Sequence, residues 1–250
     1  MDHTQAIILS IKNFRENDKI INFYTKDFGK KEILATGSRK INSKLNPHLQ
    51  YFAVLEISFI KGRNLDRLTN ANLKINYSQI KLSLKAIALG EFCLETVNQL
   101  TKSSHPDKKI FDLLTALFDL LSNNSIIEQK KSLLVSAFLV KLLSFLGYTP
   151  ELYICLKCKN KIIEQGIFFS FKKGGSICPN CHQENSLEQP ISAEAIKILR
   201  LFLSEKLDII RRIKLAKRIL TEVNKITINF LKFHLDRPLN SEQFLKWTIT

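Results

Sequence analysis

Four of the five cysteines form two C-x-x-C pairs, and their spacing constrains the fold more than any other feature of the sequence. The pairs are Cys155–Cys158 and Cys178–Cys181, with nineteen residues between them. Each C-x-x-C turn can present two sulfurs to one ion, and this interval is typical of tetrathiolate zinc sites. Apolar residues on either side of a turn at Lys172–Gly175 predict two short strands between the pairs. The pattern predicts a zinc ribbon, a module over residues 153–186 that holds one Zn²⁺.

Four thiolates complete a tetrahedral shell, so no position remains for a water molecule or a substrate. We therefore expect the zinc to be structural and His182, beside the last cysteine, not to be a ligand. Redox-active or free cysteines are the alternative, but they do not explain two pairs at ribbon spacing. The lysines of the module could neutralise the anionic cluster or contact nucleic acid, and the sequence leaves both roles open: Lys157, Lys159, Lys161, Lys172 and Lys173.

The segment before residue 80 has the pattern of a small β-barrel. Its apolar residues come in short runs rich in Ile, Val and Phe, separated by turn signals such as Asn17-Asp18 and Gly62-Arg63-Asn64. Five short strands and one long basic loop suit an OB-type barrel. We expect an OB-fold nucleic-acid-binding domain over residues 1–80.

From residue 81 the apolar spacing becomes helical. The pattern predicts an α-helical domain over residues 81–250, into which the zinc module of residues 153–186 is inserted. After Pro190 it predicts two helices, at about 193–204 and 206–234. The expected fold class is α+β, with an N-terminal OB-type barrel followed by an α-helical domain with an inserted tetra-cysteine zinc ribbon.

The formal net charge of +15 and the pI near 9.6 favour a polyanionic partner, with nucleic acid ahead of an anionic membrane surface. The longest apolar stretch, residues 133–146, is interrupted by polar residues and reads as a buried helix. The N-terminus shows no basic and apolar signal pattern. We expect a cytoplasmic protein without a membrane partner.

A loop over residues 36–45 combines small polar residues with the cations Arg39, Lys40 and Lys44. Such a loop can approach a phosphate backbone closely, although an ordinary solvated hairpin is an equally good reading. Distributed cations nearby favour nucleic acid. We name as further candidate DNA contacts Lys19, Lys30 and Arg63. Five aromatic residues could stack on bases, but most are expected to be core: Phe14, Phe23, Tyr24, Tyr51 and Phe52.

Residues 206–220 read as an amphipathic basic helix. The default interpretation is a surface helix packed on the core, with contact to phosphate or to an acidic partner as a secondary role. The candidate partner-binding residues are Arg211, Arg212 and Lys214.

The motifs of nucleotide-binding loops, zinc proteases and α/β-hydrolases are missing, and no paired carboxylates suggest two-metal nuclease chemistry. The sequence therefore predicts a protein that is not an enzyme.

Three separated segments, in the same order, resemble the RecO family of bacterial recombinational DNA repair proteins. The middle segment is Leu146-Gly-Tyr148-Thr-Pro150, which leads into the cysteines, and the last is His234-Leu-Asp-Arg237-Pro-Leu-Asn-Ser241 with Phe244-Leu245. The N-terminal series comprises Phe14-Arg-Glu-Asn-Asp18-Lys-Ile20, Thr25, Gly29-Lys30, Gly37-Ser-Arg39, Leu45, Leu49-Gln-Tyr-Phe52, Gly62-Arg63, Leu65 and Leu68.

The resemblance implies a mediator of DNA repair and recombination that binds and anneals single-stranded DNA. It also implies contact with double-stranded DNA, with RecR and with the acidic C-terminal tail of single-stranded-DNA-binding protein. With RecR, such a protein helps to load the RecA recombinase on strands coated by single-stranded-DNA-binding protein. The resemblance also implies a location associated with the nucleoid.

Carried onto this chain, the family's basic loop falls on Arg39, Lys40 and Lys44, and its zinc ligands fall on the four paired cysteines. Thr36, Ile41-Asn42 and Tyr51 depart from the family pattern, which makes the loop less basic than usual. A zinc-ribbon and OB-fold RNA-binding protein is the alternative function, and strand annealing would discriminate the two.

Overall fold

The computed structural model describes residues 1–163, 165–183 and 187–245 and contains two compact units, Met1–Ser125 and Ile126–Thr250. The first holds a closed five-stranded barrel and two helices, and the second is helical with a small sheet and a four-cysteine cluster. The predicted fold class is confirmed.

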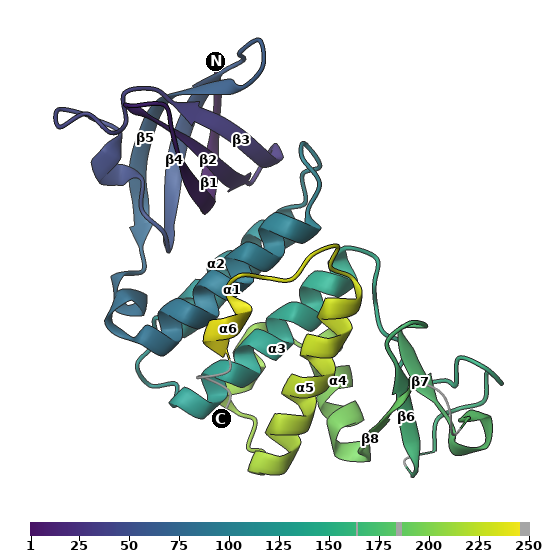
Figure 1. The fold of residues 1–250 in the computed structure, drawn as a ribbon. Coiled ribbons are helices and arrows are strands. Elements are labelled where there is room, and N and C mark those ends of the chain that lie inside the picture. Colours follow the sequence, from purple (N-terminus) through teal and green to yellow (C-terminus); the bar gives the residue numbers. More distant parts are fainter. Residues whose placement is uncertain (164, 184–186, 246–250) are drawn as a thin grey trace. The chain divides into compact units, whose positions relative to one another are not determined.

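The barrel has the strand order β1-β2-β3-β5-β4 (Figure 1). Alternate side chains of each strand point inward and form its apolar core, which includes Ile8, Ile21, Phe23, Leu55 and Phe59. The strands are β1 (Asp2–Phe14), β2 (Asp18–Thr25), β3 (Gly29–Ala35), β4 (Ala53–Ile60) and β5 (Asp66–Asn76).

A short seam closes the barrel. Four neighbouring strand pairs are antiparallel, but β3 and β5 pair in parallel through only Ile33 with Asp66 and Leu34 with Arg67. Lys31 Nζ lies 3.0 Å from Asp66 Oδ2, so an ion pair crosses the same seam. The closure therefore rests on few contacts.

Two helices complete the first unit, and both begin with capped N-termini. Ser83 accepts a hydrogen bond from the Ala86 N–H of α1 (Leu84–Leu100), and Asp107 accepts one from the Lys109 N–H of α2 (Lys108–Leu121). The ring of Phe52 meets that of Phe118 edge to face at 5.6 Å, which joins the end of the barrel to α2. Short 3₁₀ helices flank β4 and β5: η1 (Asn46–His48) and η2 (Ser78–Leu82).

The turn between β2 and β3 packs against the connection between α1 and α2. Gly29 has φ +67°, and a Cβ there would lie 2.4 Å from the carbonyl oxygen of His105. Lys30 Nζ donates to the Asn98 carbonyl at 2.6 Å, and the Ser104 N–H donates to the Lys30 carbonyl. The Gly29-Lys30 pair therefore joins the barrel to its helices.

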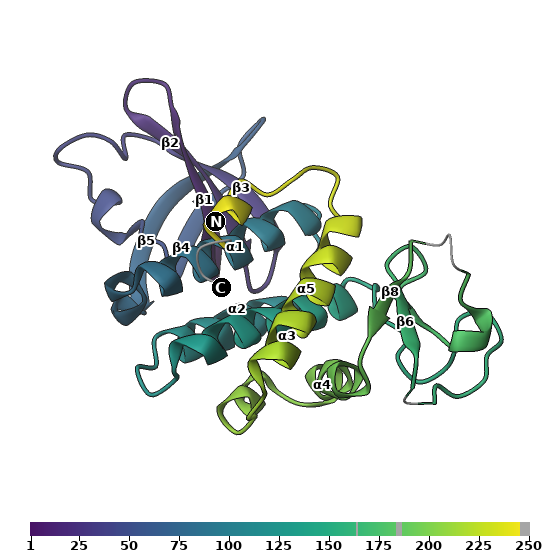
Figure 2. The same cartoon turned by 60° about the horizontal axis from the view of Figure 1, so that its bottom comes forward.

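The second unit is built on three packed helices, α3 (Glu128–Phe145), α4 (Ala193–Ser204) and α5 (Lys217–Phe233), which lie side by side in Figures 1 and 2. Ser136 of α3 donates to Asn224 Oδ1 of α5 at 2.6 Å, and both residues are buried. This polar pair fixes the register of two otherwise apolar helix faces. A short helix, α6 (Glu242–Leu245), follows α5.

The prediction of one helix over 206–234 was wrong. The structure has a 3₁₀ helix, η4 (Leu207–Arg211), and α5 begins only at Lys217 after the extended residue Ala216. Ile210 and Ile213 are buried, so the apolar spacing continues across the break and imitates a helix.

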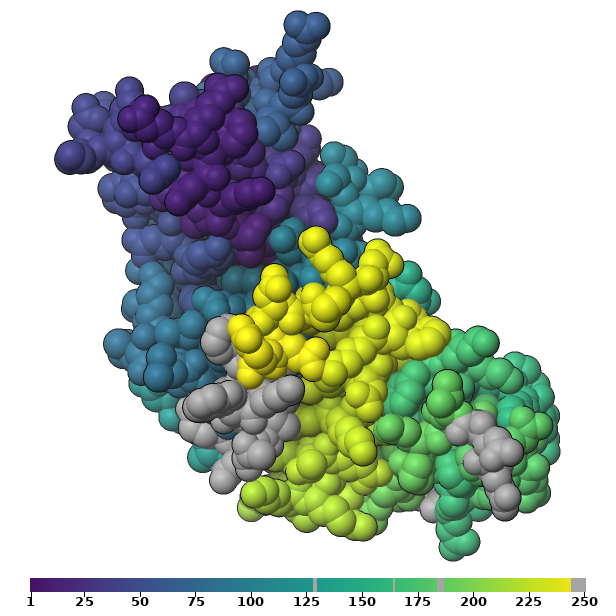
Figure 3. Space-filling model, in the orientation of Figure 1, coloured from purple at the N-terminus to yellow at the C-terminus, as the bar shows by residue number. Residues whose placement is uncertain are grey.

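The inserted module carries a three-stranded sheet with the order β7-β6-β8. Its strands are β6 (Ile167–Ser170), β7 (Gly175–Ile177) and β8 (Gln189–Ile191), and the 3₁₀ helix η3 (Pro179–Cys181) follows β7. Phe169 of β6 meets Phe230 of α5 edge to face at 5.5 Å, which anchors the module to the helices. In the space-filling view the module, in green, lies at one side of α5, in yellow-green (Figure 3).

Two of the segments that resemble RecO meet in the second unit. The Tyr148 ring stacks on the His234 ring with centroids 4.2 Å apart, although the two residues are far apart in the sequence. The matched residues Phe244 and Leu245 have side chains outside the described part of the structure.

Among the described residues, no helix has the length and apolar character needed to cross a bilayer.

Candidate metal centre and nucleic-acid interface

The structure brings the four paired cysteines together. The Sγ atoms of Cys155, Cys158, Cys178 and Cys181 all lie within 4.8 Å of one another. The two turns that carry them come from opposite ends of the module, and the ribbon strands β6 and β7 fold them toward each other. His182 does not belong to the cluster.

Backbone hydrogen bonds shape both cysteine turns. In the first, the Lys159 N–H donates to the Cys155 carbonyl and Lys159 has φ +63°, which closes the turn tightly. In the second, the Cys181 N–H donates to the Cys178 carbonyl. The Leu156 N–H donates to the Ser176 carbonyl and thereby ties the first turn to the strand that leads into the second.

The donor set and its spacing fit a tetrahedral ion. With metal–sulfur bonds of about 2.3 Å, neighbouring sulfurs of a tetrathiolate zinc site lie roughly 3.8 Å apart. Cys158 Sγ and Cys178 Sγ are 3.8 Å apart. The cluster can therefore bind a metal ion and is compatible with zinc.

The thiols differ in proton affinity. Burial alone would raise the pKa of Cys155, but N–H donors from Cys158, Cys178 and Lys157 outweigh it and lower the pKa to about 6. Hydrogen bonding to Cys178 is the main cause that raises the pKa of Cys181 to about 12. Metal ions bind deprotonated thiols, so the cluster releases protons when it takes up a metal.

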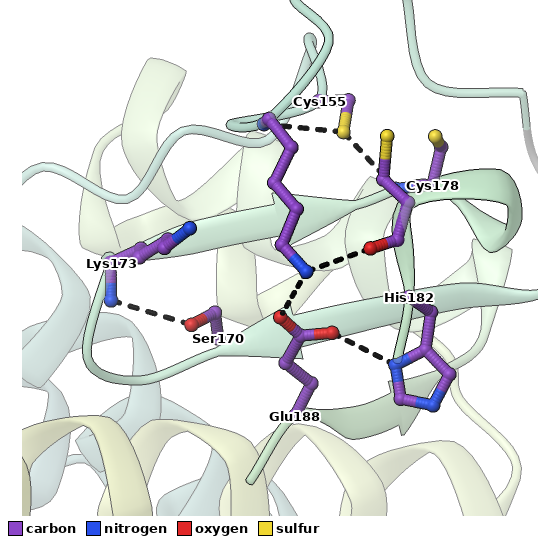
Figure 4. Close-up of polar contacts among 8 residues, drawn as sticks. Cys155, Ser170, Lys173, Cys178, His182 and Glu188 are labelled. Atoms are coloured by element: carbon purple, nitrogen blue, oxygen red, sulfur yellow. Dashed lines mark hydrogen bonds and ion pairs between the residues drawn. The ribbon is translucent and has the colours of Figure 1, made fainter. Parts of the chain in front are cut away.

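A hydrogen-bonded group beside the cluster was missed by the sequence reasoning. Glu188 has a side chain only 7% exposed, and its carboxylate lies 2.8 Å from His182 Nδ1 and 3.3 Å from Lys157 Nζ. Figure 4 shows this carboxylate between the His182 ring and a lysine ammonium. No spacing rule identifies such a residue, because its role depends on where the chain returns to the module.

The module's lysines separate into two kinds. Lys157 is partly buried, and its Nζ donates to the Cys181 carbonyl at 2.7 Å. The other four side chains are exposed at the surface of the module: Lys159, Lys161, Lys172 and Lys173.

The predicted DNA-contacting loop lies on the barrel between β3 and η1. Arg39, Lys40 and Lys44 are all exposed, and Gly37 before them has φ +66°. Asp18 Oδ1 accepts a hydrogen bond from the Gly37 N–H at 2.8 Å, which fixes the base of the loop. Arg63 is also exposed, in the turn between β4 and β5.

Arg39 Nη1 donates to the Arg15 carbonyl at 3.2 Å in an exposed contact, and two other candidate DNA contacts are also bonded within the protein. Lys30 donates to the Asn98 carbonyl, as described above, and Lys19 Nζ donates to Asn46 Oδ1 at 2.7 Å. The Lys19 contact is exposed and can exchange for a phosphate, whereas Lys30 holds α1 against the barrel.

The aromatic residues proposed for base stacking are mostly core, as expected. Phe23, Tyr24 and Phe52 are buried. Tyr51 Oη accepts a hydrogen bond from the Ile11 N–H at 2.9 Å, and Phe14 lies under the guanidinium of Arg15.

The candidate partner-binding residues lie at the end of η4 and in the break before α5 rather than on a continuous helix. All three are exposed: Arg211, Arg212 and Lys214. Arg211 Nε lies 2.7 Å from Asp208 Oδ1, and its carbonyl accepts a hydrogen bond from Lys130 Nζ of α3. Cations of two elements therefore converge at this end of the helical bundle.

Comparison with known proteins identifies the family. The family model described as "Recombination protein O N terminal" matches residues 1–77, and "Recombination protein O C terminal" matches residues 82–243. The chain belongs to the RecO family of DNA repair proteins. The resemblance noted in the sequence is confirmed.

Several curated RecO proteins match nearly the whole chain. The DNA repair protein RecO of Dehalococcoides mccartyi strain 195 is 30% identical over 234 residues, which cover 94% of this chain and 90% of that protein. Those of Desulforamulus reducens and Roseiflexus sp. are 25% and 28% identical, over 96% and 97% of this chain and 92% and 84% of theirs. The RecO-type match therefore includes the barrel, the helices and the cysteine module.

Proposed function

We propose that the protein binds single-stranded DNA on its barrel, anneals complementary strands and, with RecR, helps to load RecA on strands coated by single-stranded-DNA-binding protein. The observation that carries this proposal is the RecO-type barrel with an exposed basic loop at residues 36–45. The division into a DNA-binding barrel over 1–80, a helical domain over 81–250 and a metal module over 153–186 is part of the proposal.

The loop suits a phosphate backbone better than a base edge. Its three cations stand near the small residues Gly37 and Ser43, so a strand can approach closely, and Arg63 and Lys19 extend the positive charge on the same barrel. Contacts of this kind depend on charge rather than on sequence. Double-stranded DNA can bind in the same way.

Annealing needs no bond chemistry. Cations that neutralise the phosphates of two strands reduce their repulsion and hold them close, which is catalysis by proximity. We propose that the protein is not an enzyme in the usual sense and that it works without nucleotide hydrolysis.

Zinc is the proposed metal, because four thiolates at tetrahedral spacing are its typical structural site. Bound there by Cys155, Cys158, Cys178 and Cys181, it would supply structural cross-linking of the module. The four ligands leave no position for substrate, so the metal's role is stability.

The helical unit is proposed to receive the acidic tail of single-stranded-DNA-binding protein. Arg212 and Lys214 are exposed, and Lys130 binds the Arg211 carbonyl beside them. An anionic tail finds complementary charge here. RecR remains a proposed partner without an assigned surface.

Annealing of coated strands tests the function. We expect complementary strands coated with single-stranded-DNA-binding protein to anneal in the presence of this protein without ATP, and faster than when the coating protein lacks its acidic tail. Annealing can be followed by fluorescence transfer between labelled strands. Equal annealing rates with and without the tail would contradict the proposed binding of the tail by this protein. Tighter binding to RNA without annealing would favour the RNA-binding alternative.

The salt dependence of binding tests the loop. Changing Arg39, Lys40 and Lys44 together to Ala should reduce the slope of log affinity against log salt by roughly 2, at about 0.7 for each lost phosphate contact. A control variant, with Lys102, Lys108 and Lys109 changed to Ala, removes the same charge. These lysines are exposed in the segment that follows α1, and their loss should change the slope little. If both variants show the same slope, the strand does not follow the loop.

A further inference from the structure

We propose that Glu188 is a positioning residue that holds the two cysteine turns in the geometry that the metal requires. Glu188, Lys157 and His182 form what we term the Glu188 clamp. The proposal rests on metal binding at the four cysteines, which is part of the proposed function.

The clamp connects three segments that are separate along the chain. Lys157 lies inside the first cysteine turn, His182 directly follows the second, and Glu188 directly precedes β8. One carboxylate contacts both cysteine turns, since Glu188 Oε1 is 3.3 Å from Lys157 Nζ and Oε2 is 2.8 Å from His182 Nδ1. The distance between the turns is therefore set by this carboxylate as well as by the ligands.

A second contact makes the link between the turns direct. Lys157 Nζ donates to the Cys181 carbonyl at 2.7 Å, so the ammonium of the first turn binds the backbone of a ligand in the second. Glu188 orients that ammonium. Without the carboxylate, Lys157 would lose one of the two partners that hold its flexible side chain in this position.

The other side of the clamp is fixed by ring stacking. The His182 ring lies on the Phe168 ring of β6 with centroids 3.5 Å apart and an interplanar angle of 5°. Its Nδ1 faces Glu188, so the ring cannot rotate without losing either the stacking or the hydrogen bond. Cys181, one residue before His182, is thereby held against the ribbon sheet.

Charge explains why a carboxylate is tolerated here. Four thiolates around a divalent cation carry a net negative charge, so a nearby buried carboxylate would oppose metal binding if it were alone. The Lys157 ammonium, which contacts the Glu188 carboxylate and the carbonyl of the ligand Cys181, offsets both charges. The structure thus assigns Lys157 to the metal centre, whereas the four exposed lysines of the module keep their charge for other partners.

Groups that hydrogen-bond around a metal site typically change its affinity by about 10–100-fold when they are removed. We expect Glu188→Ala and Lys157→Met to release the metal at least about tenfold faster to a chromogenic chelator than the unchanged chain. Glu188→Gln keeps an acceptor for Lys157, so it should release the metal faster than the unchanged chain but more slowly than Glu188→Ala. Lys172→Met makes the same chemical change as Lys157→Met at an exposed position and should release metal at the original rate.

Two further measurements separate positioning from general stability. Co²⁺ substituted into the unchanged chain and into Glu188→Gln reports the ligand geometry by its absorption, which we expect to be distorted in the variant. Thermal unfolding of the metal-free proteins should hardly differ. If Glu188→Gln and Lys157→Met release metal at the rate of the unchanged chain, the clamp proposal is overturned. An unchanged chain that binds no metal would overturn the metal centre itself.

Discussion

Changing Cys155 to Ser should abolish tight metal binding and unfold the module in the second unit. Structural zinc contributes about 10–16 kcal/mol in small zinc-finger peptides, which is comparable with the whole stability of a typical domain. Cys155 is fully buried and accepts N–H bonds from Lys157 and Cys178, so its loss removes a ligand and two backbone partners. We expect the module to lose protection against hydrogen exchange throughout β6 and β7.

The loss should reach α5 and stop before the barrel. Phe169 packs on Phe230 of α5, so disorder in the module removes a contact from that helix. It also removes the bond from the Ser176 N–H to the carbonyl of Glu151, in the segment that follows α3. Hydrogen exchange resolved by peptide can measure this spread. Cys93→Ser, which changes a buried thiol of α1 outside the cluster, should keep its metal. A Cys155→Ser protein whose module stays protected would show that the cysteines are not a structural metal site.

Gly29→Ala should destabilise the first unit far more than Gly37→Ala. Both glycines have nearly the same positive φ, +67° and +66°, so both variants incur a left-handed backbone strain of about 1–2 kcal/mol. At Gly29 the new Cβ would also lie 2.4 Å from the His105 carbonyl oxygen and 2.8 Å from the Pro106 nitrogen. Backbone atoms cannot yield cheaply, and overpacking adds about 1–3 kcal/mol.

At Gly37 the nearest atom is the flexible Lys40 Cδ at 3.8 Å, so strain alone remains. Urea denaturation followed by a barrel probe should therefore give a loss of about 2–5 kcal/mol for Gly29→Ala and about 1–2 kcal/mol for Gly37→Ala. Equal losses would mean that the turn does not depend on its contact with the α1–α2 connection.

The barrel and the cysteine cluster could be predicted because their signals are local. Strand positions follow from short apolar runs between turn residues, and each C-x-x-C pair brings two sulfurs together within a single turn. The break between Arg212 and Lys217 could not be predicted, because Ile210 and Ile213 keep the apolar spacing of a helix while the backbone departs from it. Hydrophobic periodicity reports which side chains are buried, not which dihedral angles the chain adopts.

The roles of individual cations were also beyond the sequence. Lys30 and Arg39 look equivalent as basic residues next to turns, yet Lys30 binds a helix carbonyl in a part-buried contact, whereas the exposed Arg39 binds the Arg15 carbonyl at the surface. Glu188 carried no signal at all, since its partners come from both cysteine turns. Which charges remain for a ligand depends on contacts between distant segments.

The short seam of the barrel has a consequence for self-association. Beyond Arg67 the described strand β5 has ladder partners on one side only, in β4, and η1 packs against it, so part of its other edge carries no strand partner. Such edges are templates for intermolecular sheets unless charge and irregular strand geometry discourage pairing. Here Lys74 stands near the exposed Leu73 and Ile75, and two register shifts distort the β4–β5 ladder. The aggregation resistance of the barrel therefore depends on a few residues of β5 that take no part in its core.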